Sequence, residues 1–480
     1  MVEDASPREL LGFRLIGYSI GDFGISLVNI LFGTFVFQFY VYTINLNSIL
    51  VSIGISMQLI IGAFFSIIFG VIVDNKTPGK LGKRRPFLLF ALPLWVLANI
   101  LIWFPPWHAP QADSFFWPTA IYLWFMMILQ AISGTLIFNV YLSMLPEQSQ
   151  TQKNRKIVAS NRAIFSIIAS ILALMLPLIV QSILADPENV KWWQPSGELI
   201  LLYIPMIGIT FAIFGLITII FTFFSVDEKF HNNTSINEKN KISIVSTIQQ
   251  IAVPIKDKKF RNFLVVRFLH SISGITLGIL IFPFLVIVLK FKESEFFIYI
   301  IVSIFSKFTW YFIWRKILTK RSLITKYFIC IGLATIASLL ELLFLLEFLS
   351  FELKIFIFIL SIGTILGSMY AFPLFAIPIG ATLVHEASHK DEKLNTSIAI
   401  SKLSGAYYGS LTFITSIGQA LSSIILGFIL SGPNENNPII ITFLISSMGI
   451  FYLISLLFLK NIKLNEELSE IPLLNNELSQ

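Results

Sequence analysis

Three charged residues lie within long apolar stretches of this sequence, where an ionised side chain needs a partner or a function. Asp22 stands about nine residues into the first stretch, or roughly 13 Å along a helix. Arg267 lies at a comparable depth in the seventh stretch, and Lys307 near the middle of the eighth. Such charges often mark the path of an ion or solute, although a structural ion pair or a snorkelling side chain leaves the same pattern. All three are therefore candidates for binding a solute or for coupling its transport to a cation, H+ or Na+.

Uncharged polar and aromatic residues in the apolar stretches form a second set of candidates. An amide or a phenol can hydrogen bond a hydroxylated solute, and an aromatic ring can stack on the face of a sugar. Aromatic residues at helical spacing more often belong to the core or to the interfacial belt. The residues that could line a solute path are Gln58, Gln130, Asn139, Tyr407, Tyr408 and Gln419.

The segment His385-Glu386-Ala387-Ser388-His389 matches the H-E-x-x-H pattern of zinc metalloproteases. Two imidazoles one helical turn apart can hold Zn2+ while the glutamate activates a water molecule. No downstream acidic motif supplies a third ligand, and the segment ends an apolar stretch. A solvated helix end is therefore the favoured interpretation. A membrane zinc protease that uses His385, Glu386 and His389 is the weaker alternative.

The elements that carry these residues follow from an apolar composition. Hydrophobic residues make up 56% of the 480 residues and charged residues only 13%, more apolar surface than one water-soluble core can bury. Apolar stretches of about 20 to 30 residues recur, each long enough to cross a hydrocarbon layer of roughly 30 Å as a helix. The expected fold class is therefore an all-α integral membrane protein, because lipid offers backbone polar groups no other partner.

Apolar runs and the polar breaks between them predict about twelve transmembrane helices in two six-helix halves. The longest polar stretch divides the chain into an N-terminal half at 1-226, a central cytoplasmic loop at 227-258, a C-terminal half at 259-460 and a cytoplasmic tail at 461-480. The predicted spans are 13-42, 47-74, 86-104, 117-145, 157-184, 198-226, 259-290, 293-318, 322-347, 352-384, 398-431 and 438-460.

The basic residues predict the orientation. Most of the 34 Lys and Arg residues fall at the termini and in the even-numbered connections, which the positive-inside rule assigns to the cytoplasm. We therefore expect a multi-pass protein of the cell membrane with both termini cytoplasmic. The net charge of +7 reflects these loops and predicts no nucleic-acid partner. The expected partners are the lipid bilayer and a small-molecule solute, and nothing in the sequence indicates an oligomeric state.

A charged turn follows the second apolar stretch. Gly70-Val-Ile-Val-Asp74-Asn-Lys76 leads into Gly82-Lys83-Arg84-Arg85-Pro86. An acid at a helix end can pair with such arginines and lock two helices together until the halves rock apart. The segment resembles the loop signature of the major facilitator superfamily, which implies a cytoplasmic gate formed by Asp74, Arg84 and Arg85. A basic loop with a fortuitous acid is the alternative.

Three further segments narrow this resemblance. They are Gly17-Tyr-Ser-Ile-Gly21-Asp22-Phe-Gly24, then Leu145-Pro146-Glu147 with Arg155 and Asn161-Arg162, and then Gly405-Ala-Tyr407-Tyr408-Gly409 continuing to Ser416-Ile-Gly418-Gln419-Ala420-Leu421. They resemble the first helix, the loop after helix four and the eleventh helix of the glycoside-pentoside-hexuronide:cation symporters, the branch that contains melibiose permease. The resemblance covers nearly the whole chain and implies a sugar carrier with Arg155 and Arg162 in its cytoplasmic gate.

The charged positions of that branch are missing from this chain. Two cation-binding acids of helix two, two sugar-binding acids of helices one and four, and a lysine of helix eleven are all replaced. The acids and the lysine are expected to be lost together, because either charge left without its partner in a low dielectric would be costly. The sodium coupling and sugar specificity of the branch therefore do not carry over. The residues at these positions are Gly62 and Ser66, Ser26 and Phe138, and Ser416.

The leading hypothesis is a secondary active transporter, and not an enzyme, that moves a small polar organic solute by alternating access. A sugar or glycoside is favoured only through the resemblance, and a carrier of lysolipids or other amphiphiles with the same fold is the rival. We expect Asp22 to carry the coupling or solute-orienting charge, with Arg267 as its preferred partner and Lys307 as the second choice. Apart from a coupling cation, H+ or Na+, no cofactor is expected.

Overall fold

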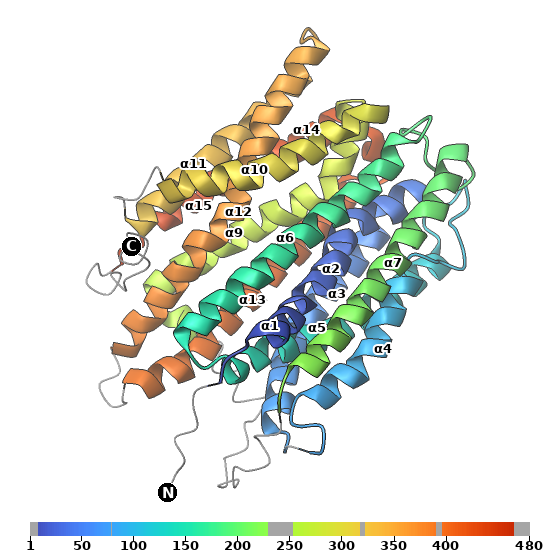
Figure 1. Ribbon diagram of the computed structural model, residues 1–480. Coiled ribbons are helices and arrows are strands. Elements are labelled where there is room, and N and C mark those ends of the chain that lie inside the picture. The colour runs from blue at the N-terminus through green and yellow to red at the C-terminus, as the bar shows by residue number, and fades with distance from the viewer. Residues whose placement is uncertain (1–7, 78, 229–252, 317–321, 390–395, 465–480) are drawn as a thin grey trace, which may run out of the picture. The chain divides into compact units, whose positions relative to one another are not determined.

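The computed structural model describes residues 8–77, 79–228, 253–316, 322–389 and 396–464. Within these ranges some side chains, including those of Asp74 and His389, are not described. The described residues form helices and no strands, in agreement with the predicted all-α class (Figure 1). Eleven of the helical segments are long and apolar enough to cross a membrane, and a twelfth apolar helix, Arg85–Leu101, is shorter. The prediction of about twelve spanning helices is therefore confirmed.

The helices of the first six spans lie close to their predicted ranges. The first span consists of three consecutive segments, because α1 ends at Ser19 and the helix continues as α2 and a π-helical turn, η1. The segments are α1 (Gly12–Ser19), α2 (Gly21–Gln38), η1 (Phe39–Thr43), α3 (Ser48–Asn75), α4 (Arg85–Leu101), α5 (Trp117–Gln148), α6 (Gln152–Ser182) and α7 (Pro195–Ser225).

The remaining spans also follow the apolar stretches. Short π-helical and 3-10 turns end or join several of them. The segments are α9 (Lys258–Pro283), η4 (Phe284–Val288), η5 (Glu293–Glu295), α10 (Phe296–Lys316), α11 (Leu323–Leu340), η6 (Glu341–Leu345), α12 (Phe351–His389), α13 (Thr396–Ile429), η7 (Gly432–Asn436), α14 (Pro438–Ser446) and α15 (Met448–Leu459).

Local sequence determines where several helices begin. The Asn47 side chain accepts a hydrogen bond from the Ile49 amide and caps α3, and the Thr151 hydroxyl caps α6 in the same way. A proline at the first turn of α4 suits a helix start, since its missing amide hydrogen would have no intrahelical partner there. Asn45 adopts a positive φ of 66° in the tight turn before α3, a conformation that asparagine tolerates better than most residues.

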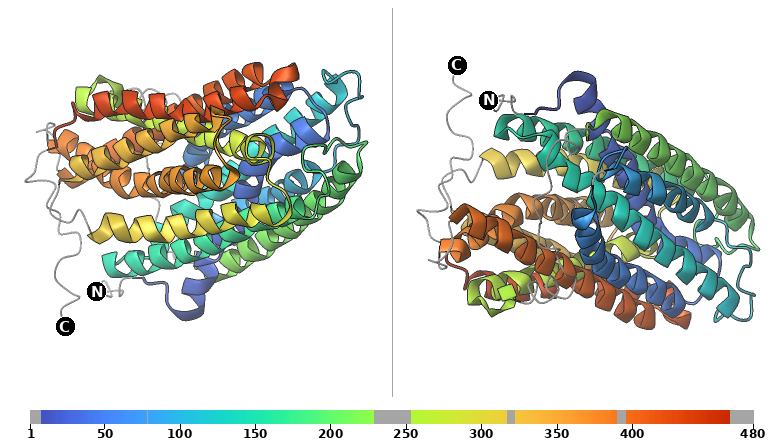
Figure 2. Two further views of the ribbon diagram at one scale, coloured as in Figure 1. Left: turned by 90° about the horizontal axis from the view of Figure 1, so that it is seen from above. Right: turned by 90° about the horizontal axis from the view of Figure 1, so that it is seen from below.

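The glycines of the first motif allow α1 and α2 to lie against α7. A Cβ atom added to Gly24 would lie 2.7 Å from the Cα atom of Gly215 and would also clash with the Thr218 hydroxyl. Cβ atoms on Gly17 and Gly21 would clash with the hydroxyls of α7 in the same manner. The motif therefore serves close helix packing. In both views of Figure 2 the green ribbon of α7 lies beside the blue ribbons of the first helices.

The described residues fall into two compact units. The first lies within Met1–Ile244, Gly278–Ile300 and Ala420–Ile441, and the second within Val245–Leu277, Ile301–Gln419 and Thr442–Gln480. In the first unit α2 packs on α6 and α7, and α3 packs along α5; in the second, α11 packs on α12 and α15. The predicted division at 227-258 stays a prediction, since most of that loop and of the tail lies outside the described residues.

Candidate functional site

Asp22 is held by an ion pair between α2 and α6. Its Oδ1 atom lies 3.2 Å from Nη2 of Arg162, and each side chain is 16% exposed. One helical turn further along both helices, the hydroxyls of Ser26 and Ser166 lie 3.1 Å apart. The two pairs repeat at a spacing of four residues on each helix and therefore mark the line along which α2 and α6 meet.

Two stacked tyrosines complete this site, which we call the Asp22 cluster: Asp22, Arg162, Tyr141 and Tyr18. The guanidinium carbon of Arg162 lies 4.9 Å from the ring centroid of Tyr141, and the Tyr141 ring stacks on Tyr18 at 4.8 Å. Each hydroxyl donates to the backbone carbonyl of the other tyrosine, at 2.7 Å and 3.1 Å. A cation or solute that binds the Asp22 carboxylate must therefore compete with Arg162.

The pairing of Asp22 differs from the one expected. Arg267 was the expected partner, and Arg162 was expected in the cytoplasmic gate. The carboxylate is instead bound by Arg162, because α2 packs directly on α6. Tyr141 did not emerge from the sequence analysis. Its position one turn before Leu145-Pro146-Glu147 was a usable signal, because residues four apart lie on one helical face.

Arg267 belongs to a separate polar group in the second unit. It interacts with the hydroxyl of Tyr327, which also lies 2.9 Å from Nδ1 of the buried His270. Nε2 of His270 lies 3.2 Å from the Ser455 hydroxyl, and its ring stacks on Phe372 with a centroid distance of 4.3 Å. The group ties α9 to α11, α12 and α15. His270 did not emerge from the sequence analysis, although it stands three residues after Arg267 in the same apolar stretch.

Lys307 lies in a different part of the second unit. Its side chain is 8% exposed, and its ammonium lies 4.5 Å from the ring centroid of Tyr370 on α12. A cation over an aromatic face is stabilised by the ring quadrupole, more strongly when water is excluded. Lys307 is therefore still a candidate for solute binding, and the Tyr370 ring is a partner for its ammonium.

The neutral candidates on α3 and α5 form two hydrogen-bonded pairs. Nε2 of Gln58 donates to Oε1 of Gln130 at 2.7 Å. Nδ2 of Asn139 donates to the Ser66 carbonyl at 3.0 Å and lies 3.1 Å from its hydroxyl. The structure thus brings together residues that sequence reasoning singled out separately. At Ser66, the position at which the related branch carries an acid, the polar groups of α3 are hydrogen bonded to the neutral side chain of Asn139 on α5.

The aromatic candidates of α13 have different surroundings. The buried Tyr407 lies 4.3 Å from the ring of Phe260 and is therefore a core residue. Tyr408 is 40% exposed, so its ring is accessible to a solute. Gln419 is partly exposed, and its side chain has no polar contact within the described part of the chain, so it can hydrogen bond a ligand.

Two acids that were not assigned to the predicted cytoplasmic gate, Glu147 and Glu228, lie at the charged turn. Nη2 of Arg84 lies 2.9 Å from Oε1 of Glu147 at the end of α5. Oε2 of Glu228 accepts the backbone amides of Arg84 and Arg85 at 2.8 Å and 3.3 Å. A carboxylate at this position compensates the positive end of α4. The side chain of Asp74 lies outside the described residues, so its pairing with the arginines remains a prediction.

The other basic residues assigned to the gate have local contacts. Nε of Arg155 donates to the Ser149 carbonyl at 2.8 Å, and the guanidinium of Arg85 lies 5.2 Å from the ring centroid of Phe223. These contacts join the ends of neighbouring helices within the first unit. A role of either arginine in gating stays a prediction.

The H-E-x-x-H segment uses its acid for an ion pair. Oε2 of Glu386 lies 2.6 Å from Nζ of Lys259 on α9, so the glutamate that would activate water in a protease is engaged by a lysine. His389 lies outside the described side chains. Among the side chains that are described, no three His, Cys, Asp or Glu residues are grouped to hold a metal ion.

Comparison with known proteins identifies both the family and the fold. The sequence profile described as MFS/sugar transport protein matches residues 17–466. A mutant of the nucleoside transporter NupG superposes with a TM-score of 0.64 at 12% identity, covering 94% of this chain and 100% of that one. The D-xylose-proton symporter gives 0.60 at 12% identity over 93% and 97%. A bacterial homolog of the human lysosomal transporter Spinster gives 0.57 at 13% identity over 93% and 95%. No curated protein sequence matches the chain.

Proposed function

The chain belongs to the MFS/sugar transport protein family and is a multi-pass secondary transporter of small polar solutes, and on this premise we propose that it carries a sugar or glycoside. Transport proceeds by alternating access, with both termini in the cytoplasm of the cell. The observation that carries the proposal is the match of that family over 17–466.

The neutral pairs on α3 and α5 support a hydroxylated solute. Gln58 with Gln130, and Ser66 with Asn139, present amide and hydroxyl groups within apolar helices. Amides both donate and accept hydrogen bonds, as sugar hydroxyls do, and buried polar pairs can exchange partners when a ligand replaces the lost bond.

The Asp22 cluster supports a coupling role for Asp22. Its carboxylate is mostly buried and its charge is compensated by Arg162. Protonation of Asp22, or binding of Na+, would weaken that pair and release α2 from α6, so the cluster can link the binding of a cation to helix movement.

Uptake by purified protein in proteoliposomes tests the solute. We expect sugars or glycosides to compete for uptake and Gln130→Leu to weaken the apparent affinity by about 3- to 10-fold, since one hydrogen bond to the solute is lost. Thr210→Val is the matched control, because the Thr210 hydroxyl donates to the Met206 carbonyl on the exposed face of α7. Competition by lysolipids and none by sugars would contradict the proposal and favour an amphiphile carrier.

A further inference from the structure

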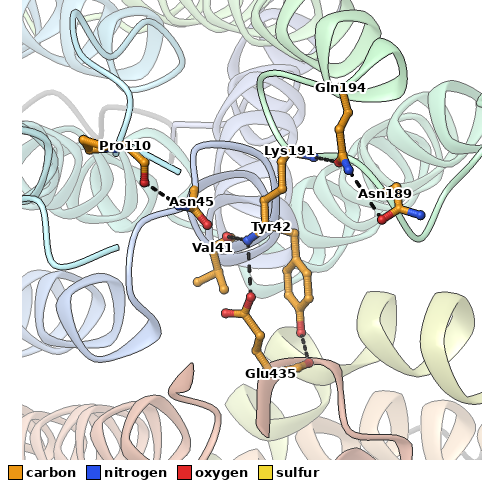
Figure 3. A network of polar contacts seen from close by, with 8 residues as sticks. All are labelled: Val41, Tyr42, Asn45, Pro110, Asn189, Lys191, Gln194 and Glu435. Carbon is orange, nitrogen blue, oxygen red and sulfur yellow. Dashed lines mark hydrogen bonds and ion pairs between the residues drawn. The ribbon is translucent and has the colours of Figure 1, made fainter. Parts of the chain in front are cut away.

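An ion pair joins two connections that are far apart in the sequence. Lys191 lies between α6 and α7, and Glu435 lies in η7, between α13 and α14. Nζ of Lys191 is 3.2 Å from Oε1 of Glu435 and 3.1 Å from the Val41 carbonyl (Figure 3). The side chains are 18% and 17% exposed. The pair is therefore largely withdrawn from water, unlike an incidental surface contact.

The backbone around this pair is held as well. The Tyr42 hydroxyl donates to the Glu435 carbonyl at 2.8 Å, and the Trp192 amide donates to the Thr43 carbonyl at 2.8 Å. Within the described part of the chain, the titratable groups of neighbouring elements that contact Glu435 are Lys191 and Tyr42. We call these three residues, Lys191, Glu435 and Tyr42, the loop clasp.

The Lys191 side of the clasp is preorganised by its own connection. The backbone amide of Lys191 donates a hydrogen bond to Oε1 of Gln194 at 2.8 Å, and Nε2 of Gln194 donates to Oδ1 of Asn189 at 3.5 Å. On the neighbouring turn, Nδ2 of Asn45 donates to the Pro110 carbonyl at 2.8 Å (Figure 3). These hydrogen bonds hold the connection that carries Lys191 in place, so Glu435 can pair with Lys191 again after the ion pair has broken.

Tyr42 and Glu435 stand just before α3 and just after α13, and these two helices meet through small residues. The Ser48 hydroxyl donates to the Gly427 carbonyl at 2.8 Å, and the Ser56 hydroxyl donates to the Ala420 carbonyl at 2.8 Å. A Cβ atom on Gly427 would clash with Ser52, so the two helices approach closely at this position. We call this contact the serine seam.

The serine seam can open at little cost in hydrogen bonds. The hydroxyl of Ser56 also lies 2.8 Å from the Ser52 carbonyl of its own helix, so it keeps a partner when the contact with α13 is lost. A hydroxyl that exchanges one acceptor for another leaves no buried donor unsatisfied.

We propose that Lys191 and Glu435 are gating residues of transport, whose pair holds this end of the serine seam closed and breaks when the solute path opens there. The proposal rests on the proposed alternating access. It assigns Lys191 the role of compensating a carboxylate that the closed contact buries. It also assigns Tyr42 the role of positioning Glu435 through its backbone carbonyl.

Thiol labelling at the serine seam tests the gate without any solute. Cys330 is the only cysteine and is buried, so Cys330→Ala provides a background free of thiols. Ser52 is fully buried in the closed seam, and Ser52→Cys therefore reports opening by its rate of reaction with a water-soluble thiol reagent. Lys191→Gln should raise that rate about fivefold, because it leaves the carboxylate of Glu435 buried without a counter-charge.

Matched variants separate gating from general damage. Lys191→Gln/Glu435→Gln should return the rate close to that of the parent, since removing both charges costs far less than removing one. Glu188→Gln, at an exposed acid of the same connection, should leave the rate unchanged. An equal rate in the parent and in Lys191→Gln, or a double variant as fast as the single one, would overturn the proposal.

A crosslink provides the functional readout. In the same background, Lys191→Cys/Glu435→Cys joined by a short, reducible bis-thiol reagent should lower uptake at least about tenfold, and reduction should restore it. Treating each single variant with the same reagent should leave that variant's own uptake unchanged. Full uptake by protein that is completely crosslinked would overturn the gating role. If Lys191→Gln raises the labelling rate as expected but the protein takes up no sugar, only the proposed solute is contradicted.

Discussion

Neutralising Asp22 should uncouple solute transport from the driving cation and lower the stability of the protein. Asp22 is the one carboxylate deep within the first six predicted spans. Its oxygen lies 3.2 Å from the Arg162 guanidinium, and both side chains are 16% exposed. At an effective dielectric constant of about 20, unit charges at that distance attract by about 5 kcal/mol, most of which desolvation offsets. Asp22→Asn leaves the guanidinium without its counter-charge, which should cost about 3 kcal/mol of stability.

Two measurements check these effects separately. Thermal unfolding of the detergent-solubilised protein reports stability, and uptake into proteoliposomes reports coupling. Asp22→Asn and Arg162→Gln should each lower stability, and the double variant should lose about 1–3 kcal/mol less than the sum of the two. Asp22→Asn should also abolish concentrative uptake while counterflow exchange partly remains, because exchange needs no net driving cation.

Ser26 supplies the control on the same helix face. Its hydroxyl meets Ser166 one turn beyond the ion pair, so Ser26→Ala removes a neutral contact between the same helices. It should cost about 1 kcal/mol and leave coupling unchanged. Strict additivity of Asp22→Asn and Arg162→Gln would refute the energetic argument. Normal H+-dependent or Na+-dependent concentrative uptake by a well-folded Asp22→Asn protein would refute the coupling role.

Four further predictions concern packing, the loop clasp, orientation and metal. Gly24→Ala should destabilise the protein by about 1–3 kcal/mol in thermal unfolding, whereas Gly33→Ala, with open space around its Cβ position, should be nearly neutral; equal losses would contradict the packing role. Burial raises the pKa of Glu435 despite the adjacent Lys191 ammonium, so the closed contact binds a proton more readily than a solvated glutamate does. The labelling rate of Ser52→Cys, divided by the rate of a small free thiol at the same pH, should therefore fall as pH falls from about 7 towards about 4.5, and Glu435→Gln should remove that fall in the ratio. Tags at either terminus should be protected from impermeant reagents in intact cells, and exposure of one would reverse the proposed orientation. Purified protein should contain no stoichiometric zinc, and one tightly bound zinc per chain would revive the metalloprotease alternative.

The sequence alone determined the membrane class, the number of spanning helices and most of their ends. These properties are local: a run of about 20 apolar residues needs lipid, and residues such as Asn47 and Thr151 start helices through bonds to their own backbone. The family was also accessible from sequence, because the segments around Asp22 and Arg84 resemble motifs of the major facilitator superfamily, and the MFS/sugar transport protein profile matches residues 17–466.

Only the tertiary structure decided which polar groups meet. The sequence placed Asp22, Arg162 and Arg267 deep in helices or at their ends, but the choice between the two arginines depends on how α2 and α6 are rotated against each other. No periodicity within one helix encodes that rotation, because helix pairing in lipid is set by packing between small residues and by hydrogen bonds across the contact. The same reason explains why the Lys191–Glu435 pair, which joins residues 244 positions apart, became visible only in the folded chain.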